Sequence, residues 1–129
     1  MASLTPHRDS LLSGLDEARH RLDALQATGA RGFEVEMSFG VMKAALLPVA
    51  DMLDRRMPFE DVQTALESAL ANLVSSHAMN VEDGDATGAA SFAVDMLERV
   101  AVTVVKRLAA NTPHVSVYRP VDHGAGGTA

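Results

Sequence analysis

The chain has 129 residues, of which 47% are hydrophobic and 22% are charged, and this balance excludes a disordered tail. A chain of this length buries about two-thirds of its unfolded surface on folding, so we expect one domain with one core. There is no cysteine, which excludes disulfides, thiolate metal sites and cysteine nucleophiles and suits a reducing cytosol.

The net charge of −6 is concentrated in one stretch of the chain. Residues 57–98 contain eight acidic residues and neither lysine nor arginine. A surface of that sign repels phosphate groups, so we expect no direct binding to nucleic acid or to an anionic membrane. Residues 1–10 lack a basic start followed by an apolar run, and no stretch approaches the roughly 20 apolar residues of a membrane helix. We therefore expect a cytoplasmic protein whose acidic stretch favours a basic partner.

Residues 10–27 are predicted to form the first helix. Apolar residues recur there at spacings of four and three, as Leu11, Leu15, Ala18, Leu22 and Leu25. Such a narrow seam is typical of a helix packed nearly parallel to a neighbour. Two glycines in residues 28–32 are expected to end this helix.

Residues 33–41 fit two patterns. Apolar and polar residues alternate, as in a half-buried strand, but the same segment also places apolar residues on one helical face with Ala44 and Pro48. We favour helix from Phe33 to Asp54, because Glu and Met are good helix formers. The alternative is a small two-stranded sheet formed by residues near 33–39 and 114–118.

Two prolines mark boundaries in the middle of the chain. Pro48 interrupts the apolar run of residues 44–50, where it removes a backbone donor, so we expect a kink or break near Leu46 and Leu47. Pro58 fits the first position of a third helix, with Glu60 and Asp61 in its first turn.

The third helix is predicted to end near residue 79 and the fourth to cover residues 89–110, with an exposed loop over residues 80–88. The fourth helix has a wide apolar band, typical of the most enclosed helix of a bundle. The predicted fold is therefore mainly α, a four-helix bundle. Residues 1–113 form its single domain, and residues 114–129 form a C-terminal extension with a flexible end.

Metal sites are weakly indicated. Asp83, Asp85 and Thr87 match the first half of a calcium-binding loop, but the position that should carry a closing glutamate is Val94. A solvated acidic turn in which Asp85 or Thr87 caps the next helix explains these residues better. The pair Glu17 and His20 has the spacing of di-iron ligands but occurs once, off the apolar seam of its helix.

The second predicted helix carries a surplus of apolar residues and ends in two arginines. Four methionines, Met37, Met42, Met52 and Met57, cluster there, and flexible thioethers suit both an irregular core and an adaptable binding surface. Arg55 and Arg56 follow Asp51 and Asp54 in a charged corner. These arginines either close the helix C-terminus or clamp a partner carboxylate.

The sequence predicts a non-enzymatic protein-interaction module: a homodimer, or a small regulatory, adaptor or inhibitory subunit. It would bind a protein partner through an apolar helix face and an acidic surface, without a cofactor. The partner-binding residues expected are Met37, Val41, Met52, Arg55, Arg56, Met57, Glu82, Asp83 and Asp85. The alternative is a helical bundle that binds a small molecule or a metal, conceivably an enzyme, with a pocket opened at Pro48 and lined by Phe39, Met42 and His77.

Overall fold

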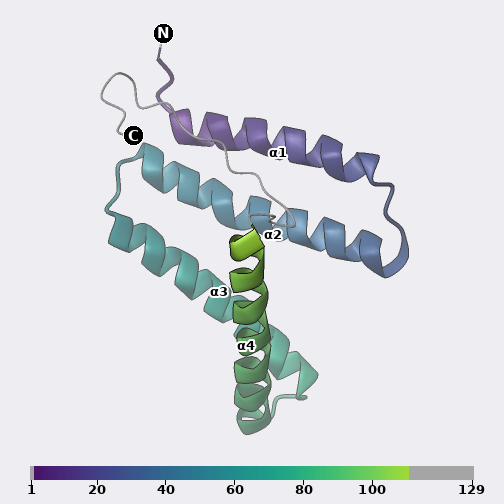
Figure 1. Cartoon of the computed structure of the whole chain (residues 1–129). Helices are drawn as coiled ribbons and strands as arrows, with labels where there is room; N and C mark the ends of the chain where they lie inside the picture. The colour runs from purple at the N-terminus through teal and green to yellow at the C-terminus, as the bar shows by residue number, and fades with distance from the viewer. Residues whose placement is uncertain (1, 111–129) are drawn as a thin grey trace. The chain divides into compact units, whose positions relative to one another are not determined.

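The structure is a computed structural model, and it describes residues 2–110. These residues form four helices, α1 (Pro6–Ala24), α2 (Gly29–Asp54), α3 (Phe59–Val81) and α4 (Ala86–Ala110) (Figure 1). The prediction of a mainly α chain with four helices is confirmed. Across residues 2–110 we find no helix with the length and apolar content needed to span a membrane.

The described residues divide into two compact parts, residues 2–62 and residues 63–110, and α3 runs from the first into the second. The single domain expected over residues 1–113 stays a prediction. The C-terminal extension expected over residues 114–129 lies outside the described residues.

In the first part, α1 and α2 lie side by side and antiparallel (Figure 1). The seam predicted for the first helix forms their contact: Leu15 and Ala18 are buried, at 4% and 2% exposed. The partly buried residues packed against this pair come from both helices and are Leu11, Phe39, Met42, Leu46 and Leu47. Since no large side chain of the described residues is fully buried, the core of this helix pair is thin.

Residues 33–41, for which both a helix and a strand were considered, are helical, because they lie inside α2. No strand is present among residues 2–110, so the small sheet is not supported, and its other proposed strand, residues 114–118, lies outside that range. This segment is helical because the helical spacing places Val35, Phe39 and Met42 on the side that faces α1. A strand in its place would have no partner strand to pair with.

Of the kink or break expected near Leu46 and Leu47, the break is wrong, since α2 continues through Pro48 to Asp54, and the kink stays a prediction. Proline removes one backbone hydrogen bond and crowds the preceding turn. Here Leu46 and Leu47 before it pack against α1, and Ala50 after it is buried at 5% exposed. Packing on both sides of Pro48 holds the helix together.

The turn between α1 and α2 uses the left-handed backbone region at one of the two predicted glycines, Gly29, and also at Gln26. Gln26 takes a φ of 50° after the end of α1, and Gly29 takes a φ of 61° at the start of α2. Gly32 is needed for another reason, because a Cβ there would come within 2.9 Å of the Ala27 carbonyl oxygen.

In the second part, a tight turn joins α3 to α4, and the loop expected over residues 80–88 is shorter than predicted. Ala78 near the end of α3 and Ala89 near the start of α4 are buried, at 0% and 6% exposed. The rings of His77 and Phe92 lie 5.7 Å apart between their centroids. The expectation that α4 is the most enclosed helix is wrong, because every residue from 97 to 110 is exposed.

Candidate functional site

Two rows of apolar residues run along opposite sides of α2. At about 100° per residue, Val35, Phe39, Met42, Leu46 and Ala50 fall on one side of the helix. We call these residues the inner row. They are buried or partly buried, and Phe39, Met42 and Leu46 contact the α1 residues Leu15 and Ala18. α1 therefore covers the inner row.

The opposite side of α2 carries Phe33, Met37, Val41, Ala44 and Pro48, which we call the outer row. All five residues are exposed. Phe33 is 77%, Met37 is 67% and Val41 is 41% exposed. An α-helix normally has one apolar side, which packs against its own protein. α2 has two, and α1 covers only one of them.

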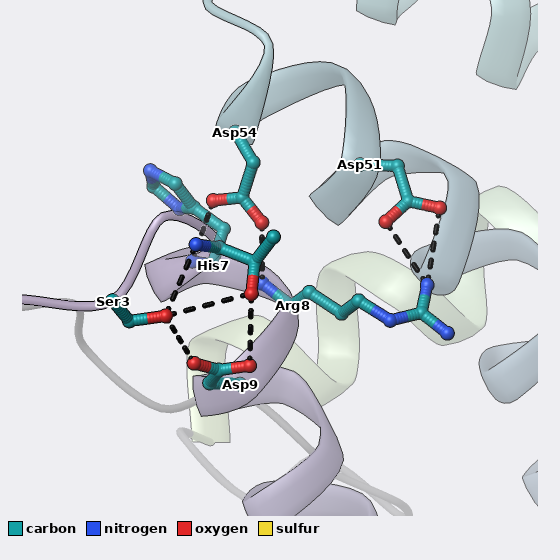
Figure 2. A network of polar contacts seen from close by, with 7 residues as sticks. Ser3, His7, Arg8, Asp9, Asp51 and Asp54 are labelled. Carbon is teal, nitrogen blue, oxygen red and sulfur yellow. Dashed lines mark hydrogen bonds and ion pairs between the residues drawn. The ribbon is translucent and has the colours of Figure 1, made fainter.

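The ends of α1 and α2 are joined by a polar network that the sequence did not predict (Figure 2). The Asp54 carboxylate accepts the backbone N–H of His7 at 2.7 Å and that of Arg8 at 2.9 Å. The Arg8 guanidinium donates to both oxygens of Asp51, at 3.0 and 3.1 Å. Ser3 and Thr5 hydrogen bond to Asp9 in the first turn of α1.

This network has a physical cause. Asp51 and Asp54 lie in the last turn of α2, where the helix dipole disfavours negative charge. The start of α1 offers unpaired N–H groups, so one carboxylate at this end caps the neighbouring helix. The charged corner predicted around Arg55 and Arg56 is thus arranged differently: Asp51 and Asp54 turn toward α1. Two acids at a helix C-terminus are the signal in the sequence that could have indicated such a partner.

Arg19 joins α1 to the middle of α2. Its guanidinium donates to Asp23 of its own helix and, at 2.7 and 2.8 Å, to both carboxylate oxygens of Glu36 on α2. It also lies 4.9 Å from the centroid of the Phe39 ring. Hydrogen bonding to Arg19 lowers the pKa of Glu36, and hydrogen bonding to Glu36 and Asp23 raises the pKa of Arg19. This arginine fixes the side of α2 that faces α1, and with it the side that faces away.

A shallow cleft of about 430 Å³ lies beside this arginine, at the turn between α1 and α2. Its charged lining residues, Arg19, Asp23 and Glu36, are paired with one another. Phe33 forms part of its apolar wall. The residues of the predicted pocket, Phe39, Met42 and His77, do not line this cleft. Phe39 and Met42 pack in the core of the α1–α2 pair, and His77 contacts Phe92 in the second part.

The other predicted contact residues of α2 lie at its C-terminal end. Met52 is partly buried, and Met57 is 38% exposed. Arg55 and Arg56 are exposed, and Arg56 takes a φ of 57°. The Met57 N–H donates a hydrogen bond to the Met52 carbonyl at 3.0 Å. This bond is typical of a helix end at which the chain passes through a left-handed residue.

The predicted acidic residues Glu82, Asp83 and Asp85 lie in the turn between α3 and α4, in the second part of the chain. The Asp85 carboxylate accepts the Thr87 N–H at 3.2 Å, so Asp85 caps α4. A Cβ at Gly88 would come within 2.7 Å of an Asp85 oxygen and 3.0 Å of a Glu82 oxygen, so both carboxylates lie at the start of α4, where its dipole favours them.

Metal binding finds no geometric support in the part of the chain that is described. Within residues 2–110, no three side chains among His, Cys, Asp and Glu come together as a metal ion would require. Glu17 and His20 lie on the exposed side of α1, where Glu17 is near Arg21 and His20 is near Asp16.

The structure therefore brings Met37 and Val41 together on one open helix side and places Met52, Arg55, Arg56 and Met57 at the end of the same helix. The acidic residues belong to the second part. Phe33 belongs to the outer row as well, although no binding role was predicted for it. Its position four residues before Met37 was the available signal. Comparison with protein-family models, curated proteins and solved structures finds no match for this chain.

Proposed function

We propose that this chain is a non-enzymatic protein-interaction module, a small regulatory, adaptor or inhibitory subunit, that binds its partner through the outer row of α2. The observation that carries the proposal is that α2 is apolar on two opposite sides and that α1 covers only one of them. Exposed apolar residues in a contiguous row commonly mark a protein-binding surface.

The two large side chains of the outer row are suited to anchor a partner. Phe33 and Met37 are one helical turn apart and mostly exposed, so a groove on a partner can cover both. When an apolar helix side binds in a groove, residues three and four positions apart make the contacts. Met37 adds a flexible thioether that adapts to the shape of its surroundings.

Charge would select the partner. The exposed acids Asp83 and Asp85, with the partly buried Glu82, lie in residues 57–98, which contain neither lysine nor arginine. Acidic surfaces attract basic proteins, speed their encounter and repel nucleic acids. Arg55 and Arg56 are exposed at the end of α2, where they would hold a carboxylate of the partner at the edge of the contact.

The test is capture of binding proteins from an extract of the native source with three forms of the chain. Wild type and Gln63→Glu should retain the same protein, because Gln63 is exposed and lies outside the outer row. Met37→Glu adds the same charge within the row and should lose at least about 2 kcal/mol of binding, since a charge must then be desolvated in an apolar contact. Equal capture by all three forms would remove the outer row from the binding surface.

A further inference from the structure

We draw no further inference here: the strongest candidate, the exposed apolar side of α4 that bears Leu97, Val104 and Leu108, carries nothing because nothing in the structure shows what covers it.

Discussion

Arg56 adopts a left-handed backbone conformation, with a φ of 57°, immediately after the end of α2. A residue with a Cβ pays about 1–2 kcal/mol for this conformation, whereas glycine does not. We expect Arg56→Gly to raise the free energy of unfolding by about 1 kcal/mol, measured by urea denaturation. Arg55→Gly is the matched control, because it removes the same charge from a residue with a φ of −81°. Equal effects of the two variants would show that charge, and not backbone conformation, decides the outcome.

Asp54 caps α1 from the neighbouring helix through the backbone N–H groups of His7 and Arg8. Asp54→Ala removes both hydrogen bonds and should lower the free energy of unfolding by about 1 kcal/mol, as loss of a helix cap does. Glu67→Ala, an exposed acid in the middle of α3, should change it by less than about 0.5 kcal/mol. If Asp54→Ala behaves like this control, α1 does not depend on the cap.

Glu36 gives the α1–α2 pair a dependence on pH. Its pKa is lowered from the ordinary value of 4.5 because Arg19 hydrogen bonds to the charged form. A lowered folded pKa stabilises the fold above the unfolded value, and this contribution disappears as the pH falls through the folded pKa. We therefore expect Glu36→Gln to melt below wild type at about pH 7, with a difference that narrows as the pH falls below the ordinary pKa of 4.5, by thermal circular dichroism. A constant difference would exclude this ion pair as the source.

The residues of the outer row were easier to predict than the residues that hold the helices together. Met37 and Val41 could be assigned from their spacing alone, because a periodic pattern states which residues share a helix side. The partners of Asp51 and Asp54 could not, since they depend on which helix end lies beside them, and that is set by packing far along the chain. The same holds for Arg19, whose partner Glu36 lies 17 residues away.

The two apolar rows of α2 have different roles. Phe39 in the inner row packs against α1, whereas Phe33 in the outer row is 77% exposed. Phe39→Ala should lower stability by about 3 kcal/mol at every protein concentration, because it opens a cavity in the core. Phe33→Ala should cost less than about 0.5 kcal/mol, because most of its side chain is exposed. A loss of stability for Phe33→Ala as large as that for Phe39→Ala would show that Phe33 belongs to the core.

Helix boundaries and the helix count follow from the sequence, and helix burial does not. The continuous apolar run of residues 44–50 was expected to break at Pro48, yet contacts with α1 on either side keep α2 intact. In α4 the wide apolar band was expected to be enclosed, but residues 97–110 are exposed. Periodicity identifies which side of a helix is apolar, but it does not identify the molecule that covers that side.

For the whole molecule, the separation of charge predicts how the partner is recognised. Removing the charges of the turn between α3 and α4, with Glu82→Gln, Asp83→Asn and Asp85→Asn combined, should slow association with a basic partner by about three- to tenfold and leave dissociation unchanged. The rates are measured by surface plasmon resonance at two salt concentrations. An effect confined to dissociation would mean that these acids contact the partner directly.

α1 covers one apolar side of α2, and methionine oxidation measures whether the opposite side is open in the whole chain. In dilute protein treated with peroxide, Met37 on the outer row should be oxidised about five times faster than Met42, which packs against α1, as peptide mass spectrometry would show. Equal oxidation rates, with Met37 as slow as Met42, would mean that another part of the chain covers this side of α2, and would contradict the proposed binding surface.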